Sequence, residues 1–476
     1  MKQLTLPPSK IGKRWWMVAL IGVPLTSGLL WLTQADWATQ LQDLGGLTWS
    51  QLDAPYRYPY PDSLAESSAP TARIEQEIAH YQQVVRQPAS SGLSASSGLD
   101  QGALAIAYLQ MARATGQGHW YLLADQAAQQ SLSKLPINNS TALSVLARVA
   151  EAQHDFATTL KLAGQIPDPK EAIALQVTTN LALGKLPAAN QAAQQLVDLT
   201  LSPSAFTLQA LVQVAQGQDA AALKNFDYAL TIEEPGELST SARTRTLLGR
   251  FYYERGQLDL ANDLYREALH ILPNYPAAQM NLAQLEIRRQ RYGAADRHYA
   301  QLSAASAGAS TVYDPLVLRG RARVRALQGD RPAAEALWTE AETLLRQSFA
   351  GTSGFTLGHR RDLARLLLER GNPSDTAEAV ALMQTEVTRR RDAETLDTYA
   401  WALAAQGQWQ QAQTVVKEAI ALGTRDATLL HRAATIETAL GNPTQAATYR
   451  QQAQAIDPNF DEQAQQAAGL GAGLGS

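Results

Sequence analysis

Side chains that could perform metal or acid–base chemistry are spread along the 476-residue chain without the spacings that such chemistry needs. The seven histidines never stand three or four residues apart, the spacing at which one helix holds a metal ion with two imidazoles. The neighbouring carboxylates Glu233 and Glu234 precede Pro235 and Gly236, so we expect a solvated loop rather than a general acid and base. The chain has no cysteine, which excludes disulfides, thiolate nucleophiles and Cys-ligated zinc. The sequence therefore predicts a protein that is not an enzyme and that has no metal or other cofactor.

Phosphate-binding and nucleophile motifs are also missing. The stretch "GKLPAA" from Gly184 lacks the upstream glycine and the following Ser or Thr of a phosphate loop, and no G-x-S-x-G elbow occurs. Residues 243–370 are locally basic, with 19 arginines against 13 acidic side chains, but the whole chain carries a net charge of -4. This acidic balance disfavours nucleic acid as a partner. The remaining function class is the binding of other proteins.

The composition indicates helices throughout. Alanine, glutamine and leucine dominate the chain, and the β-branched runs that a buried parallel strand needs are nearly absent. Residues 71–87 place Ile74, Ile78, Tyr81 and Val85 on one face, which predicts an amphipathic helix. Asp100, after a segment rich in Ser and Gly, is a candidate N-cap for the next helix.

Residues 248–273 place small and aromatic side chains at fixed positions around a central glycine. The fixed positions are Leu248, Gly249, Tyr252, Gly256, Ala261, Tyr265, Ala268 and Pro273. A shift by 34 residues gives a second copy that lacks the turn glycine and the proline, with Leu282, Ala283, Ala295 and Tyr299. Two further copies near the C-terminus contain Gly407, Ala412 and Ala419, then Gly441, Ala446, Ala453 and Pro458. Weaker copies are centred on His154, Gly184, Gly217, Gly329 and Gly371.

This pattern resembles the tetratricopeptide repeat (TPR) family. The resemblance implies an all-α fold in which about nine to ten helix-turn-helix units stack into a right-handed α-solenoid over residues 100–462. Small residues such as Gly249, Ala261 and Ala268 would let helices approach, while Tyr252 and Tyr265 would fill the space between them. Residues 463–476 are expected to form a flexible tail.

The N-terminus carries a second strong pattern. Residues 15–34 contain no charge and would span roughly 27 Å or more as a helix, close to the thickness of a bilayer. Lys10, Lys13 and Arg14 precede this run, which predicts a cytoplasmic segment 1–14 and an extracytoplasmic (periplasmic) remainder. Tryptophans stand at both ends of the run, as they do at membrane interfaces. We expect a transmembrane signal anchor at 15–34 and a linker or stalk at 35–99, as in a membrane-anchored TPR protein of the bacterial type. The alternatives are a cleaved signal peptide, which would leave a secreted soluble protein, and a buried soluble helix.

The TPR resemblance also selects candidate binding residues. In that family the first helix of each repeat lines the concave face, and the register implies a peptide-binding groove formed by Arg243, Arg250, Arg288, Arg319, Arg323, Arg361, Arg365 and Trp401. A column of guanidinium groups suits an acidic peptide or a C-terminal carboxylate, because each can bind a carboxylate through two parallel hydrogen bonds. The alternative is that these arginines lie on an ordinary solvated face.

The sequence therefore predicts a membrane-anchored scaffold or adaptor that binds partner proteins or peptides through a TPR groove. The alternatives are a secreted adaptor, a regulatory subunit of an envelope enzyme complex, and an architectural module that associates with its own copies. The chaperone-binding subclass of TPR proteins is not implied, because its Lys and Asn clamp residues have no counterpart at Thr246 and Arg250.

Overall fold

A computed structural model describes residues 56–60, 70–86, 94–305, 310–349 and 358–469. These residues all belong to one unit, residues 51–476. The predicted membrane anchor at 15–34 lies outside the described residues. Within the part of the chain that is described, no helix is both long and apolar enough to cross a bilayer.

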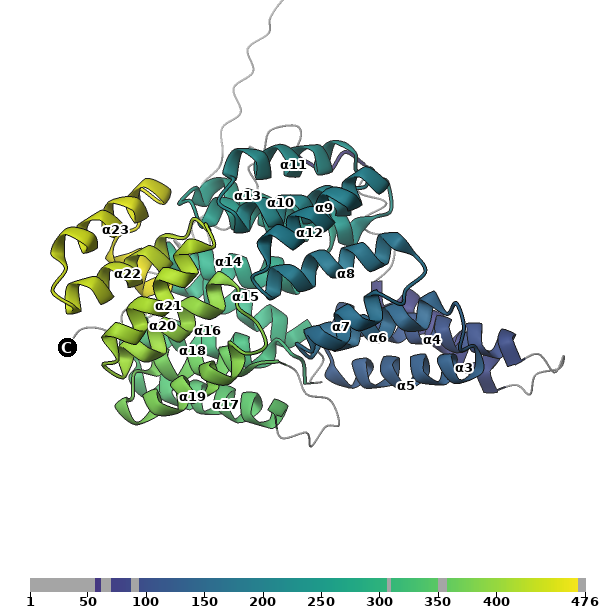
Figure 1. The fold of residues 1–476 in the computed structure, drawn as a ribbon. Helices are drawn as coiled ribbons and strands as arrows, with labels where there is room; N and C mark the ends of the chain where they lie inside the picture. The colour runs from purple at the N-terminus through teal and green to yellow at the C-terminus, as the bar shows by residue number, and fades with distance from the viewer. Residues whose placement is uncertain (1–55, 61–69, 87–93, 306–309, 350–357, 470–476) are drawn as a thin grey trace, which may run out of the picture. The chain divides into compact units, whose positions relative to one another are not determined.

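Ten consecutive pairs of helices make up most of the described chain, and each pair packs against the next (Figure 1). The first helices of the pairs are α4 (Ser94–Thr115), α6 (Ser140–Ala152), α8 (Pro169–Ala182), α10 (Pro203–Ala215), α12 (Leu238–Tyr253), α14 (Pro276–Arg288), α16 (Asp314–Leu327), α18 (Arg360–Arg370), α20 (Ala393–Ala405) and α22 (Ala427–Ala439). The second helices are α5 (Gly118–Lys134), α7 (Phe156–Ala163), α9 (Leu186–Leu199), α11 (Asp219–Thr231), α13 (Leu258–Ile271), α15 (Tyr292–Ala305), α17 (Arg331–Phe349), α19 (Thr376–Glu386), α21 (Trp409–Ala421) and α23 (Pro443–Ile456). The fold is a TPR-like, all-α helical-repeat solenoid, as the sequence predicts.

Two helices flank the ten pairs, and one short helix interrupts them. The helix α3 (Pro70–Arg86) packs on α4 and matches the amphipathic helix predicted at 71–87. The 3-10 helix η3 (Pro373–Asp375) precedes α19. The helix α24 (Glu462–Ala467) follows the last pair and packs on α14, with Ala467 buried. The expectation of a flexible tail from residue 463 is therefore wrong for α24, because this helix finds an apolar surface on α14 and α16.

Small residues allow the two helices of a pair to approach, as the repeat pattern predicts. A side chain at Gly249 of α12 would stand only 2.6 Å from the ring of Tyr265 on α13, so only glycine fits there. Ala261 and Ala268 of α13 are fully buried, and Tyr252 and Tyr265 fill the space around them. A continuous core of this kind stabilises each pair through its neighbours.

Polar caps and left-handed turns define where the helices begin and end. Side-chain oxygens accept hydrogen bonds from the first free backbone N–H groups of several helices, at Asn139, Asp155, Asp168, Ser202, Asp392, Asp426 and Asp461. Each of the ten pairs has one residue with positive φ after its first helix, which is a glycine in eight pairs and His154 or Gln290 in the others. The repeat copy with Leu282 and Tyr299, which lacks a turn glycine, therefore keeps the same left-handed turn through Gln290. Asp100, by contrast, lies inside α4, which begins at Ser94, so it is not an N-cap.

The solenoid closes on itself through contacts between early turns and late loops. The backbone N–H of Arg391 donates to the carbonyl of Ala182 (3.1 Å), and the hydroxyl of Thr424 donates to the carbonyl of Ala215 (2.8 Å). Ala215 and Thr424 are 209 residues apart, which corresponds to about six repeats of 34 residues. One turn of the superhelix therefore contains about six repeats, and successive turns touch. We call these two hydrogen bonds, with the ion pair between Arg288 and Asp457 (2.5 Å), the closure contacts.

Residues 56–60, in the predicted linker, make specific contacts with the repeats. The hydroxyl of Tyr56 lies 3.0 Å from that of Tyr252, and the backbone N–H of Tyr58 donates to Glu267 (2.8 Å). The hydroxyl of Tyr60 donates to the carbonyl of Glu233 (2.6 Å). We call residues 56–60 the tyrosine strap. It holds the chain that precedes the solenoid against α12 and α13.

The tyrosine strap covers a buried ion pair. Arg245 of α12 is fully buried, forms a bidentate pair with Glu233 and donates from Nε to the carbonyl of Tyr56 (2.8 Å). The expectation that Glu233 lies in a solvated loop is wrong, because Arg245 and the strap enclose its carboxylate. Glu234 is exposed, as expected.

Candidate functional site

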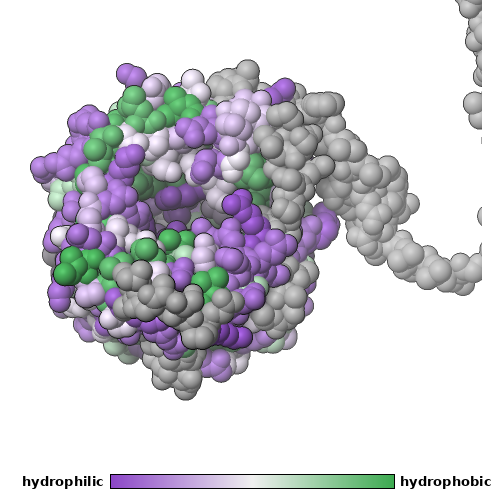
Figure 2. All heavy atoms as spheres, turned by 90° about the vertical axis from the view of Figure 1, so that its right-hand side faces the viewer, coloured by the Kyte–Doolittle hydropathy of each residue, from purple (hydrophilic) through white to green (hydrophobic). Residues whose placement is uncertain are grey.

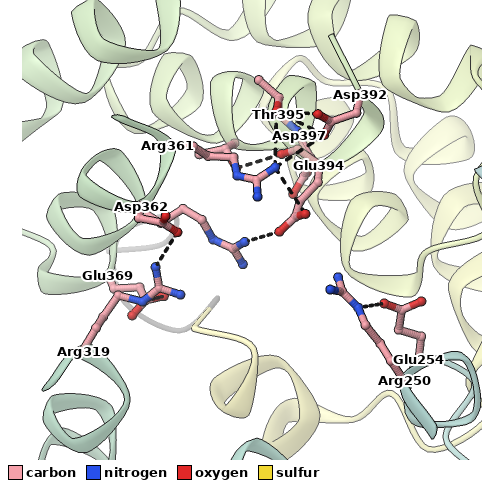
Figure 3. Close-up of polar contacts among 12 residues, drawn as sticks. Arg250, Glu254, Arg319, Arg361, Asp362, Glu369, Asp392, Glu394, Thr395 and Asp397 are labelled. Carbon is pink, nitrogen blue, oxygen red and sulfur yellow. Dashed lines mark hydrogen bonds and ion pairs between the residues drawn. The ribbon is translucent and has the colours of Figure 1, made fainter. Parts of the chain in front are cut away.

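The inner surface of the solenoid carries charged side chains from the first helices of several pairs. Figure 3 shows Arg250 of α12, Glu254 at the C-cap of that helix, Arg319 of α16, Arg361, Asp362 and Glu369 of α18 and Glu394 of α20 pointing toward a common space. We call this space the lumen. Figure 2 shows that one face of the molecule is hollowed and that largely hydrophilic residues border the hollow. A polar lumen is suited to recognition by hydrogen bonds and charge rather than by apolar contact.

Most of the predicted groove arginines in the lumen are paired with carboxylates. Arg361 contacts Glu394 (3.2 Å) and Asp392 (3.5 Å), and Arg365 contacts Glu394 (2.6 Å). Arg319 lies 3.7 Å from Asp362 and 3.6 Å from Glu369. The register of the repeats predicts the arginines but gives no signal for these carboxylates. Because carboxylates neutralise these arginines, the lumen is not the uniformly basic column of guanidinium groups that the sequence predicts.

Arg323 contacts α24, the helix at the end of the solenoid. Its guanidinium pairs with Glu369 and donates to the carbonyl of Ala467 at the end of α24 (2.8 Å). The side chain is only 11 % exposed. This arginine therefore ties α24 to α16 and α18, and little of it is open to a ligand.

Glu394 is the centre of the charge network. Arg361, then Arg365 and Arg250, lower the pKa of its carboxyl well below the usual range, despite an opposing effect of burial. Arg250 pairs with Glu254 (2.8 Å). The charges of Glu254 and of Glu394, which lies on α20, raise the pKa of the Arg250 guanidinium. The Arg250 side chain is 56 % exposed, yet it responds to Glu394 across the lumen. Arg250 is therefore coupled by charge to a carboxylate of another repeat.

Asp426, at the start of the last pair of helices, is acted on by the charges of two other carboxylates, Glu254 and Asp397. Asp426 caps α22 through the backbone N–H groups of Thr428 and Leu429. Burial, together with the charges of Glu254 and Asp397, raises the pKa of Asp426 to about 6. The capping carboxyl of α22 therefore takes up a proton at a higher pH than an ordinary aspartate does.

Two predicted groove residues are not available to a ligand. Arg288 is buried and contributes its guanidinium to the closure contact with Asp457. Trp401 is 2 % exposed, and the guanidinium of Arg432 stacks on its ring at 4.5 Å. The prediction that these two side chains line the groove is therefore wrong. The register of the repeats places these residues near the concave side, but tertiary contacts that the repeat pattern does not encode bury them.

Arg243 is the one predicted groove arginine that is exposed and has no ion pair or hydrogen bond to the described residues. Arg113, near the end of α4, shares both properties but was missed, because the first repeat is degenerate and its register is obscure. Burial by the surrounding protein, with a contribution from Arg148, lowers the pKa of both guanidinium groups. Unlike the arginines around Glu394, these two form no ion pair with a described carboxylate, although the charge of Glu151 partly opposes the lowering of the pKa of both.

Comparisons with known proteins assign the chain to no family. No protein-family model matches the chain, and no curated protein matches its sequence. Among solved structures, the human IFIT1 dimer with PPP-AAAA matches with a TM-score of 0.44 and 13% identity, over 84% of this chain and 96% of that chain. A monomeric IFIT1 mutant with Gppp-AAAA matches with a TM-score of 0.40 and 14% identity, over 81% of this chain and 86% of that chain. These scores are too low to carry an inference about ligand or partner.

Proposed function

We propose that this protein is a membrane-anchored scaffold that binds partner proteins or peptides in the lumen, on the extracytoplasmic side of the membrane. The observation that carries the proposal is the lumen itself, where charged groups from α12, α16, α18 and α20 face a common space (Figure 3). Charged side chains are seldom gathered on an enclosed surface unless they are paired or used for recognition. The proposal assigns no reaction to the protein.

The proposal of a membrane anchor rests on the uncharged sequence of residues 15–34 and on the basic residues that precede it. Cell fractionation with an antibody against the solenoid tests it. A membrane-bound chain that resists carbonate extraction and keeps its first residues supports the anchor. A shortened chain in the soluble extracytoplasmic fraction would instead support the secreted form.

Site-specific photocrosslinking in intact cells tests partner binding. A photoreactive amino acid replaces Arg250, which faces the lumen, or Arg266, which is exposed on α13. We expect distinct protein adducts from position 250 that are absent from position 266, identified by mass spectrometry. The scaffold proposal fails if position 250 yields no adduct, or only the adducts that position 266 yields. Adducts with the same chain would favour self-association.

A further inference from the structure

A cavity of about 700 Å³ lies where the second and third pairs of helices meet the loop before α20. Its apolar wall includes Phe156 and Leu160 of α7 and Leu183 at the C-cap of α8. Lys185, at the N-cap of α9, and Arg389, in the loop between α19 and α20, also line it. None of the charged residues labelled in Figure 3 lines this cavity, so it is a candidate site separate from the lumen.

The closure of the solenoid brings the two sides of the cavity together. The backbone N–H of Arg391, two residues after Arg389, donates to the carbonyl of Ala182, three residues before Lys185 (3.1 Å). A side chain at Gly184 would stand 2.5 Å from the carbonyl oxygen of Arg391, so the two segments touch. We call this contact the seam. The cavity therefore depends on the contact between successive turns of the superhelix.

The cavity carries more positive than negative charge. The side chains of Lys185 and Arg389 are exposed and form no ion pair or hydrogen bond with the described residues. Among the residues that line the cavity, the one carboxylate belongs to Asp155, which already accepts hydrogen bonds from the backbone N–H (3.1 Å) and the hydroxyl (2.7 Å) of Thr158. Two unpaired cations beside a carboxylate that is already bonded favour an anion as the ligand.

His154 lines the cavity at a turn position where most repeats have no side chain. Its φ of 58° is the left-handed conformation that glycine adopts in eight of the ten pairs, and a β-carbon there costs about 1 kcal/mol or more. The ring stacks on Phe156 (5.6 Å between centres), its Nδ1 lies 3.4 Å from the buried Glu386, and a side chain at Gly358 would collide with it. Backbone strain of this kind is typical of functional sites, and a ring held on three sides gives the cavity a fixed wall. Burial lowers the pKa of His154, so the ring adds no charge to the cavity at neutral pH.

We propose that this cavity binds a small organic anion, whose acidic group contacts Lys185 and Arg389 and whose apolar body packs on Leu160 and Leu183. The inference goes beyond the proposed function and does not rest on it, because the cavity and the lumen are formed by different residues. The volume falls within the roughly 300–1,000 Å³ of small-molecule sites, which combine apolar walls with a few polar groups. A guanidinium fork binds a carboxylate or a phosphate through two parallel hydrogen bonds. An inorganic anion would leave the apolar wall unused.

Fluorine NMR with the full-length chain in detergent micelles tests the proposal. The probe is 4-fluorobenzoate, compared with the neutral 4-fluorobenzamide and with 4-fluorophenyl phosphate, and its transverse relaxation is measured against empty micelles. Lys185→Gln/Arg389→Gln removes the two cations of the cavity, and Lys224→Gln/Arg266→Gln removes two exposed cations on α11 and α13 as a matched control. We expect 4-fluorobenzoate to bind more tightly than 4-fluorobenzamide, with affinity about tenfold weaker in the Lys185 and Arg389 variant and unchanged in the control.

Each other result has a defined meaning. Equal 4-fluorobenzoate binding by the natural chain and by the Lys185 and Arg389 variant overturns the site, as does binding that 4-fluorobenzamide matches or an absence of binding by the natural chain. Tighter binding of 4-fluorophenyl phosphate that is lost in the same variant supports the site and identifies a phosphate ester as its preferred ligand. If the double variant does not fold, Lys185→Gln and Arg389→Gln are tested singly, and unchanged binding in both overturns the site.

The seam allows a test that leaves every lining residue in place. A side chain at Gly184 displaces the carbonyl of Arg391, whereas one at Gly407 meets no atom within 4 Å. Both glycines have positive φ, so alanine strains either turn in the same way. We expect 4-fluorobenzoate to bind more weakly to Gly184→Ala and normally to Gly407→Ala. Equal binding by these two variants would overturn the inference that the anion is held across the seam.

Discussion

Gly217, in the turn between α10 and α11, lies directly against the backbone carbonyl of Gly423, in the loop between α21 and α22. A side chain at Gly217 would overlap that carbonyl oxygen. The neighbouring hydrogen bond from Thr424 to Ala215 holds the two segments together. The turn glycine of this repeat therefore serves two purposes: it adopts the left-handed conformation of the turn, and it leaves room for the closure of the superhelix.

We predict that Gly217→Ala destabilises the protein more than Gly407→Ala does. Both glycines have positive φ, 69° and 76°, so alanine costs about 1 kcal/mol or more at either position. Nothing lies within 4 Å of the position of a side chain at Gly407, whereas at Gly217 the carbonyl of Gly423 must move. Thermal unfolding followed by circular dichroism measures the difference, which we expect to be several degrees. Equal melting temperatures for the two variants would show that the closure contact contributes no stability.

The same two variants, Gly217→Ala and Gly407→Ala, test whether the closure contacts keep successive turns of the superhelix together. Loss of the contact at Gly217 should let successive turns separate, so we expect a larger radius of gyration by small-angle X-ray scattering for Gly217→Ala only. Gly441→Ala, at another turn with open space beside it, is a second control.

We predict that the Arg245–Glu233 ion pair is costly to break from one side. Both side chains are buried, with 0 % and 2 % exposure, so Arg245→Met leaves an uncompensated carboxylate and should lower the free energy of unfolding by about 3–5 kcal/mol. Arg245→Met/Glu233→Met should recover much of this loss, because no buried charge remains. Urea unfolding of the two single variants and the double variant measures the coupling. Additive losses in the double variant would contradict the prediction.

The tyrosine strap gives that experiment an independent readout. Arg245 binds the carbonyl of Tyr56, and its guanidinium lies 5.8 Å from the centre of the Tyr58 ring. The strap should therefore loosen when Arg245 is replaced. Faster proteolysis near residues 56–60 in Arg245→Met than in the natural chain is the expected result.

The repeats were predictable from the sequence because they depend on local spacing. Gly249, Ala261 and Tyr265 recur at intervals that fix helix packing within one pair, and the structure confirms each of them in that role. Gln290 shows the limit of that approach. It takes the left-handed turn conformation that glycine takes elsewhere, because the helices on either side require a turn of that shape.

The site was only partly predictable because its partners lie far apart in the sequence. The repeat register predicted Arg361 and Arg365 as members of one surface, but their pairing with Glu394 crosses from α18 to α20. Burial of Arg288 depends on Asp457, 169 residues away, and no local pattern reports it. Only the pair of Arg250 with Glu254 has a local signal in the sequence, because the two residues are four apart, a spacing at which side chains of one helix meet.

We predict that the stability of the solenoid depends on pH through Asp426. Burial, Glu254 and Asp397 raise its pKa to about 6 in the folded state, from an unfolded value of 3.8, so the folded state binds the proton more tightly. Stability contributed by this group is therefore present below pH 3.8 and is lost as pH rises to about 6. Asp426→Asn keeps a helix cap and removes the charge. Its free energy of unfolding should exceed that of the natural chain by roughly 1–3 kcal/mol at pH 8.

The advantage of Asp426→Asn should shrink as pH falls from 6 toward 4, because the natural carboxyl then becomes protonated in the folded state. Asp168→Asn changes an exposed helix cap at α8 and serves as the matched control. Urea unfolding at pH 4.5, 6 and 8 measures all three proteins. A difference between Asp426→Asn and the natural chain that does not vary with pH would contradict the raised pKa.

Finally, we predict that Glu394 keeps the lumen from binding polyanions. Its carboxylate contacts Arg361 (3.2 Å) and Arg365 (2.6 Å) and acts on Arg250 across the lumen. Glu394→Gln would leave these guanidinium groups with less compensation, so we expect the affinity for labelled oligouridylate to rise at least tenfold at low salt and to fall steeply as salt is added. Glu378→Gln removes a carboxylate that pairs with Arg346 outside the lumen and should leave the affinity unchanged. If Glu394→Gln and Glu378→Gln bind oligouridylate equally, the charge balance of the lumen has no part in excluding such ligands, and the preference for peptides would need another cause.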